Sequence, residues 1–306
     1  MKPSSHHLRG YTLILGSSVV FASYGIWSKM MGDQFGIYYQ GWVRALIVLL
    51  MITPLMYWRK MIVPIQKEDR RWFWLYIVFT LFTQVPLYYA YIKTGIGAAT
   101  LMFYAAYVIA SYIVGRYLVG EKMTKTKVAA LILAFVGLGF VYRQSALVFS
   151  AFGLAMAALN GVASGSEVSI SKNISSKYLT LTLTWYSWLA ILLTHLPVSL
   201  IASDKMAMPA FSMEWGAMIL YSLAGLLGFW LALEGLRYLD ASVASLIGLA
   251  EILWAVLFGV LFFQEKITAG VLFGGLAIFT AGLLPDVASL VSRRRKRMRP
   301  SSKAVQ

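Results

Sequence analysis

Long apolar stretches alternate with short polar connections along almost the whole chain. Stretches of about 20 mainly apolar residues, the helix length that crosses ~30 Å of hydrocarbon, lie at 11–31, 37–58, 72–92, 97–119, 126–143, 149–171, 179–202, 214–236, 242–263 and 269–288. The connections carry the charges and the helix breakers, and none is long enough for a separate soluble domain. The pattern predicts an all-α polytopic membrane protein with ten transmembrane helices.

Composition agrees with this class and narrows the chemistry. Of the 306 residues 59% are hydrophobic and 13% are charged, whereas a soluble domain carries about 25% charge. The stretch at 11–31 is longer than the ~7–15 residues of a signal-peptide core, so we expect it to be the first span. The chain has no cysteine, His6 and His7 lie in the polar N-terminal segment, and His195 stands alone, so we expect no metal and no cofactor.

The net charge of +15 is distributed unevenly between the two sides of the predicted membrane. With the N-terminus in the cytoplasm, 21 lysines and arginines fall on that side and 5 on the other, while Arg44 lies inside a span. The positive-inside rule therefore predicts a multi-pass protein of the cytoplasmic (plasma or inner) membrane with both termini cytoplasmic. The basic run at 293–299 fits this role, with anionic-lipid binding as the alternative, and nothing further indicates nucleic-acid binding.

The two halves of the chain form an internal repeat. Several landmarks of the first half recur 143 residues later: Ser28-Lys29, Trp42, Pro54 and Trp72 match Ser171-Lys172, Trp185, Pro197 and Trp215. After one residue of slippage, Glu121-Lys122 matches Glu265-Lys266. The sequence thus predicts repeats at 1–145 and 146–288 and a basic cytoplasmic tail at 289–306. Five helices are an odd number, so the second repeat would be inverted, as in many secondary transporters with a site near the membrane midplane.

Each repeat also ends in the same series of elements. A small-residue-rich helix is followed by a Glu-Lys turn, "GEKMT" at 120–124 and "QEKIT" at 264–268, and by a last helix, "AALILAFVGLGFVY" or "FGGLAIFTAGLL". With these motifs the chain resembles the EamA-type transporters of the drug/metabolite transporter superfamily, up to about Asp286. The resemblance implies a central cavity formed mainly by spans 1, 3, 4, 6, 8 and 9. Family members often carry a proline in spans 4 and 9, where this chain has Tyr107-Val108 and Glu251-Ile252.

A polar stripe marks one face of the sixth span. Residues three and four apart share a helix face, which groups Asn160, Ser164, Glu167 and Ser171. The repeat places Ser17, Phe21, Tyr24 and Ser28 at the matching positions of the first span. Two matching faces are expected to line one cavity, and helix packing through small residues is the alternative.

The matching faces of the fourth and ninth spans hold Tyr104 and Tyr107 in one and Glu251 in the other. A carboxylate at the bilayer centre is unfavourable by about 3 kcal/mol unless it is paired, hydrated or protonated. We therefore expect Glu251 to bind substrate or to carry a proton, with a structural polar contact as the alternative. Glu167 lies nearer the cytoplasmic end, where water or Lys172 could satisfy it. Arg44 is either a counter-ion or a side chain that snorkels to the outer interface.

Four further residues, Gln84, Tyr88, Trp230 and Trp254, complete the predicted lining. Aromatic faces together with carboxylates favour an organic cation, and "GSE" at 165–167 resembles the sixth span of choline-type permeases in the same superfamily. The sequence predicts a secondary transporter that moves a small metabolite or drug-like solute, with an organic amine and proton coupling as candidates, by alternating access. The alternatives are an uncoupled channel or facilitator and a receptor-like membrane scaffold, and the oligomeric state is left open.

Enzyme classes receive little support from the sequence. The run Val162-Ala163-Ser164-Gly165 lacks the first glycine of an intramembrane serine-protease motif, and His195 is the one candidate base within the spans. Asp240 and Asp286 lie at predicted helix ends, so no aspartyl pair is embedded in the membrane. We therefore expect no catalytic residues.

Overall fold

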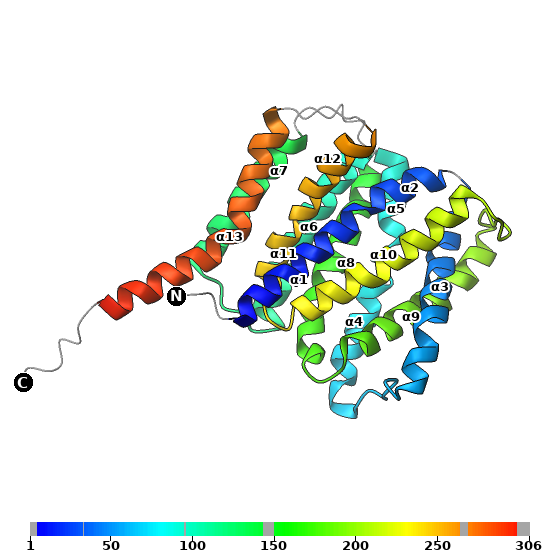
Figure 1. The fold of residues 1–306 in the computed structure, drawn as a ribbon, viewed down its shortest axis with the longest axis horizontal. Helices are drawn as coiled ribbons and strands as arrows, with labels where there is room; N and C mark the ends of the chain where they lie inside the picture. Colours follow the sequence, from blue (N-terminus) through cyan, green and yellow to red (C-terminus); the bar gives the residue numbers. More distant parts are fainter. Residues whose placement is uncertain (1–4, 33, 95, 143–149, 264–268, 299–306) are drawn as a thin grey trace, which may run out of the picture.

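The computed structural model describes residues 5–32, 34–94, 96–142, 150–263 and 269–298, and within them all regular structure is helical. The helices are α1 (Ser5–Ala22), α2 (Tyr24–Met31), α3 (Ile37–Trp58), a 3-10 turn (Lys67–Asp69), α4 (Arg70–Thr80), α5 (Val85–Thr94), α6 (Ile96–Tyr117), α7 (Lys125–Tyr142), α8 (Ala151–Ser175), α9 (Thr180–Ile201), α10 (Met213–Gly235), α11 (Ala241–Gly248), α12 (Ala250–Phe263) and α13 (Ala269–Met298) (Figure 1). The predicted all-α class is confirmed. The predicted turn at Glu265-Lys266 lies outside the described residues.

The outer surface of the helical bundle is apolar. Six segments of the described chain are long and apolar enough to cross a membrane: His7–Ser28, Ile37–Trp58, Lys67–Ala90, Thr180–Ile201, Met213–Gly235 and Ala241–Phe262. Large apolar side chains such as Leu50, Leu193 and Phe273 are about two-thirds exposed. A helix whose outward face is this apolar is suited to lipid rather than to water.

Three of the predicted spans are interrupted, whereas the hydrophobic pattern predicts them as continuous. The first is divided into α1 and α2 at Ser23, the third into α4 and α5 by residues 81–84, and the ninth into α11 and α12 at Leu249. These interruptions come from both halves of the chain. Helices interrupted at membrane depth recur at the binding sites of transporters.

The break between α4 and α5 has a cause in the sequence. Pro86 has no backbone N–H, so the carbonyl of Phe82 four residues earlier loses its helical hydrogen bond. The side-chain amide of Asn160 donates to this carbonyl at 3.0 Å, and the His195 imidazole hydrogen-bonds to the backbone of Leu81. Because backbone groups in the membrane must find partners within the protein, α8 and α9 stabilise the break.

The main helix contacts between the two halves have counterparts in which the equivalent helices of the first and second halves change places. Counterpart helices lie side by side, α3 with α9 and α7 with α13. Each first helix also packs against the third span of the other half: α1 contacts α10, and α8 contacts α4 and α5 (Figure 1). In the same way α6 lies along α8, while α11 and α12 lie along α1. Two repeats related by a two-fold axis produce this pattern.

Helices α6 and α8 pack most closely, through two glycines of α8. A Cβ atom added at Gly161 would lie 2.3 Å from the carbonyl oxygen of Phe103, and one at Gly165 would lie 2.3 Å from that of Tyr107. Two small residues four apart allow such close approach of membrane helices. The small-residue packing that was the alternative for the polar stripe of the sixth span therefore does occur, with glycines that alternate with the stripe along α8.

The last helix continues beyond its predicted end at residue 288. Helix α13 runs to Met298 and includes most of the segment predicted as a separate tail, and it projects from the bundle (Figure 1). The predicted end was set by the loss of apolar residues, but Lys and Arg are good helix formers. They are also favoured near helix C-termini, so the helix continues where the apolar stretch stops.

Candidate functional site

A buried arginine lies at the centre of the bundle. Helix α3 places Arg44 in the interior, where the residue is 0% exposed. Its Nη1 donates to Gln84 Oε1 at 3.0 Å and to the Tyr88 hydroxyl, its Nη2 donates to the Tyr24 hydroxyl at 3.3 Å, and the guanidinium lies 3.6 Å from the Tyr221 ring centre. The snorkelling interpretation is wrong, because interior hydrogen bonds hold the guanidinium. The alternative role as a counter-ion has no carboxylate partner within the described residues.

Two residues around Arg44 were not anticipated from the sequence. The Tyr221 hydroxyl lies 3.2 Å from that of Tyr88, and the Trp188 ring centre lies 5.9 Å from the guanidinium carbon. The repeat matches them with Val78 and Ala45 in the first half. Since neither counterpart is polar or aromatic, the alignment of the halves gives no signal for them.

Glu167 lies beside the break in the third span. It is 4% exposed, and its Oε1 accepts a hydrogen bond of 2.5 Å from the hydroxyl of Thr80 at the end of α4. The prediction that Lys172 could pair with the carboxylate of Glu167 is wrong, because Lys172 pairs with Glu121 and Asp240 instead. Glu167 is thus a buried acid that faces hydroxyl groups.

Glu251 stands at the start of α12 and is partly buried. It has Tyr104 as a hydrogen-bonding neighbour, and it also interacts electrostatically with Tyr24 and Tyr107. Tyr107 interacts in the same way with Glu167. The structure therefore brings the phenols of the first half and the carboxylates of the second half into one region, where the alignment of the repeats places them.

Several polar side chains of this region belong to residues at or next to the helix interruptions. Tyr24 is the first residue after the interruption at Ser23, Gln84 is the last residue of the break before α5, and Glu251 is the second residue of α12. Tyr24 accepts a hydrogen bond from Arg44 and interacts electrostatically with Glu251. We call Tyr24, Arg44, Gln84, Tyr88 and Glu251 the central site.

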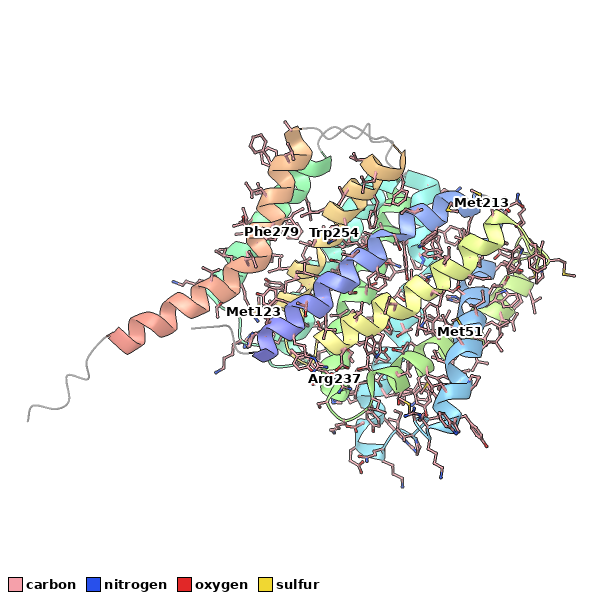
Figure 2. The ribbon with its side chains drawn as sticks, in the orientation of Figure 1. Met51, Met123, Met213, Arg237, Trp254 and Phe279 are labelled. Carbon is pink, nitrogen blue, oxygen red and sulfur yellow. The ribbon has the colours of Figure 1, made fainter. Side chains whose placement is uncertain are left out.

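Four other predicted lining residues are placed differently. Ser164 donates to Asn160 Oδ1 at 3.5 Å, and the amide group of Asn160 is engaged with the break in the third span. Trp230 on α10 is 36% exposed, and Trp254 on α12 is partly buried (Figure 2). In the described part of the chain no hydrogen bond or ring contact joins either tryptophan to the central site. Contact of these four residues with a substrate stays a prediction.

A second group of charges lies near the start of α11. Glu121 pairs with Lys127 at 3.5 Å and Lys172 at 3.6 Å, and Asp240 pairs with the same lysines at 2.8 and 3.1 Å. Glu121 also accepts hydrogen bonds from the Ala241 N–H at 2.6 Å and the Ser242 hydroxyl at 2.7 Å. We call Glu121, Lys127, Lys172 and Asp240 the Glu121 cluster. Hollows of about 250 and 460 Å³ border it, and both are lined by Lys172 and Asp240.

The Glu121 cluster predicts a pH dependence of stability. Burial acts to raise the pKa of Asp240, but Lys127 and Lys172 outweigh it and hold the pKa below the ordinary value of about 3.8. A group whose pKa is lower in the folded state stabilises the fold above its unfolded-state pKa, and this contribution is lost as the pH falls through the folded-state pKa. We expect Asp240→Asn to lower the unfolding temperature at pH 7, and we expect the difference from the unsubstituted protein to shrink only as the pH falls from about 4 toward and through the lower folded-state pKa. Unfolding in detergent between pH 7 and 3 checks this, with exposed Glu68→Gln as the control; an equal difference at both pH values would contradict it.

The fold and the site together define a class of protein. A helical bundle with an apolar outer face, interrupted helices from both halves and a buried polar centre is a polytopic membrane protein built around an internal site. No group of three metal-ligating side chains occurs in the part of the chain that the structure describes.

Comparison with known families gives the class a name. The model of the EamA-like transporter family matches residues 8–143 and, a second time, residues 151–284. The chain belongs to the EamA-like transporter family, a family of integral membrane transporters in the drug/metabolite transporter superfamily.

Solved structures share this fold. Of 28 matching chains, one crystal structure superposes with a TM-score of 0.76, covering 96% of this chain and 99% of its own, at 16% sequence identity. At this identity the likeness shows the fold alone. No curated protein matches the chain.

Proposed function

We propose that this family member is a secondary transporter that moves a small organic solute with a positively charged group across the cytoplasmic membrane by alternating access around the central site. The observation that carries the proposal is the meeting of three interrupted helices from both halves at one buried polar centre, where Tyr24, Gln84 and Glu251 converge. Interrupted helices expose polar groups to a solute without leaving unpaired backbone in lipid. A solute held between the halves changes sides when they rock against each other.

The proposed topology has ten spans in two inverted halves, with both termini in the cytoplasm. The six segments that are long and apolar enough to span support it, as does the exchange-symmetric packing of counterpart helices. The positive-inside distribution of lysine and arginine supports the orientation. In this orientation the Glu121 cluster lies on the cytoplasmic side.

The carboxylates give the site its preference for positive charge. Glu251 and Glu167 are the acids near the centre, and phenol rings surround them. An acid in such surroundings stabilises either an amine or a transferred proton. We therefore assign Glu251 to the solute or to a coupling proton, with Glu167 as the second candidate.

Transport itself is testable before the solute is identified. Thermal unfolding of the detergent-purified chain with panels of amines, amino acids and nucleosides identifies ligands. Each hit is then tested for saturable counterflow in proteoliposomes. Counterflow supports a transporter, whereas solute flux that neither saturates nor exchanges would indicate a channel or facilitator and would reject the proposal.

Glu251→Gln is expected to lower the apparent affinity for the transported solute about tenfold or more, because a buried charge without its partner is unfavourable by ~2–5 kcal/mol. Any dependence of transport on a pH gradient should also disappear, since an amide carries no proton. The measurement is counterflow with and without the gradient, and Glu68→Gln at an exposed position is the control. Unchanged affinity together with unchanged pH dependence would remove Glu251 from the mechanism.

A further inference from the structure

The guanidinium of Arg44 is a fully buried charge surrounded by neutral partners. Its described contacts are hydrogen bonds to Gln84, Tyr88 and Tyr24 and the face of the Tyr221 ring. These groups hold the guanidinium in place, but none of them carries a negative charge. Charged side chains at membrane depth normally pair with an opposite charge or mark the path of an ion or substrate. Arg44 is thus a charge for which the described chain supplies no anion.

Two donors in this region also lack acceptors. Arg44 Nε and Trp188 Nε1 are buried and have no hydrogen-bond partner among the described residues. They belong to side chains that face each other, with the guanidinium carbon 5.9 Å from the tryptophan ring centre. A buried donor without an acceptor is unfavourable. Two such donors, one of them on a cation, favour an acceptor that is negatively charged.

The backbone of α10 packs closely against the Arg44 and Trp188 side chains. Gly225 of α10 faces three groups of the site, and a Cβ added there would lie 3.0 Å from Tyr24 Oη, 3.1 Å from Arg44 Nη2 and 3.2 Å from Trp188 Cζ2. Even a methyl group at this position would press on all three. The glycine therefore allows the α10 backbone to pack directly against Tyr24, Arg44 and Trp188.

We propose that Arg44, Trp188 and Tyr24 form a subsite for a carboxylate group of the transported solute. A guanidinium binds a carboxylate through parallel hydrogen bonds, with a geometry that a lysine does not offer. This inference rests on the proposed function, in which Glu251 receives the positively charged group. Tyr24 accepts a hydrogen bond from Arg44 and interacts electrostatically with Glu251, so the two subsites belong to the same region of the protein. The transported solute is accordingly a small zwitterion, and the aromatic rings of Trp188 and Tyr221 accommodate its apolar part.

Matched probes test separately how much the amine and the carboxylate of such a solute contribute to binding. Alanine, leucine and phenylalanine are compared with the amines that lack the carboxylate (ethylamine, 3-methylbutylamine and 2-phenylethylamine) and with the acids that lack the amine (propanoate, 4-methylpentanoate and 3-phenylpropanoate). Thermal unfolding and counterflow are measured for the full chain. We expect at least one zwitterion to bind about tenfold or more tightly than both of its analogues, because a buried polar site rejects a ligand that leaves its groups unpaired.

Two outcomes overturn the carboxylate subsite. If an amine binds as tightly as its zwitterion and is exchanged, the carboxylate adds nothing, and the proposed transport function stands without the subsite. If no zwitterion binds, the assigned solute class is wrong, whether or not another solute is exchanged. Failure of the transport proposal is separate, because it shows as binding without saturable exchange.

Variants of Arg44 distinguish a subsite from a structural role. Arg44→Gln should weaken binding of the zwitterion about tenfold or more while the affinity for its amine analogue stays within about twofold. Equal loss for both ligands would show that Arg44 only supports the site and would overturn the proposal. If Arg44→Gln does not fold, Trp188→Phe removes one donor and little volume. It should raise the KM for the zwitterion but not for the amine, and an unchanged KM for both would reject the subsite.

Discussion

Gly165→Ala is expected to destabilise the protein by about 1–3 kcal/mol, the usual effect of overpacking a close contact. The added methyl would lie 2.3 Å from the carbonyl oxygen of Tyr107 and 3.0 Å from the amide nitrogen of Ser111. Both are backbone atoms of α6, so no side chain can rotate away and the two helices must move apart. Because Tyr107 interacts electrostatically with both acids of the central region, this separation also alters the site. The loss of stability is measured as a lower unfolding temperature in detergent.

Gly216→Ala is the matched control for this prediction. Gly216 is also in a helix, but an added Cβ has no neighbouring atom within 4 Å. Alanine favours a helix over glycine by about 0.5–1 kcal/mol, so this variant should be as stable as the unsubstituted protein or slightly more stable. The double variant Gly161→Ala with Gly165→Ala should yield little folded protein. If Gly165→Ala and Gly216→Ala unfold at the same temperature, the contact between α6 and α8 is looser than described.

Glu121→Ala is expected to lower the free energy of unfolding by about 3–5 kcal/mol, since removal of one partner of a buried ion pair leaves the other charge uncompensated. Glu121 is 7% exposed and Lys127 is 5% exposed. The substitution also removes the acceptor for the N–H of Ala241 and the hydroxyl of Ser242 at the start of α11. Chemical or thermal unfolding of the purified protein measures the effect.

Lys122→Ala tests whether this effect belongs to the cluster or to the turn. Lys122 is the next residue of the same turn and is exposed, so its replacement should change stability by less than about 0.5 kcal/mol. Glu121→Gln keeps one acceptor oxygen and should lie between the two variants. A loss for Glu121→Ala no larger than that for Lys122→Ala would contradict the role of the cluster.

The hydrophobic pattern predicted the helical elements well because each span must provide an apolar surface for lipid. It did not predict the interruptions at Ser23 and Leu249, since the nearby glycines, Gly25 and Gly248, are of a type that is also frequent in continuous membrane helices. The break before α5 did leave a signal in Pro86, which deprives Phe82 of its hydrogen bond. The partners that repair this break, Asn160 and His195, come from the other half of the chain and could not be predicted from local sequence.

Only part of the central site could be predicted from the sequence. The repeat alignment placed Tyr24 and Tyr107 near the carboxylates, because equivalent helices present equivalent faces. The surroundings of Arg44 could not be predicted, since Tyr221 and Trp188 have apolar counterparts in the first half. Arg44 itself aligns with Ser187, which bonds the hydroxyl of Tyr76 at 2.6 Å. Arg44 lies in the first half and the two acids, Glu167 and Glu251, lie in the second. Divergence of the repeats therefore gave the site a positive charge from one half and carboxylates from the other.

The packing of α1 has a consequence for how the protein is made. This helix is synthesised first, yet its main neighbours are α10, α11 and α12, which begin about two hundred residues later. At about 5–20 residues per second, a ribosome needs roughly 10–40 s to reach them. During that interval the hydroxyl of Ser17 lacks its final partner, the carbonyl of Gly228, to which it donates at 2.8 Å. The packing of the first helix is therefore completed only when the second half has been synthesised.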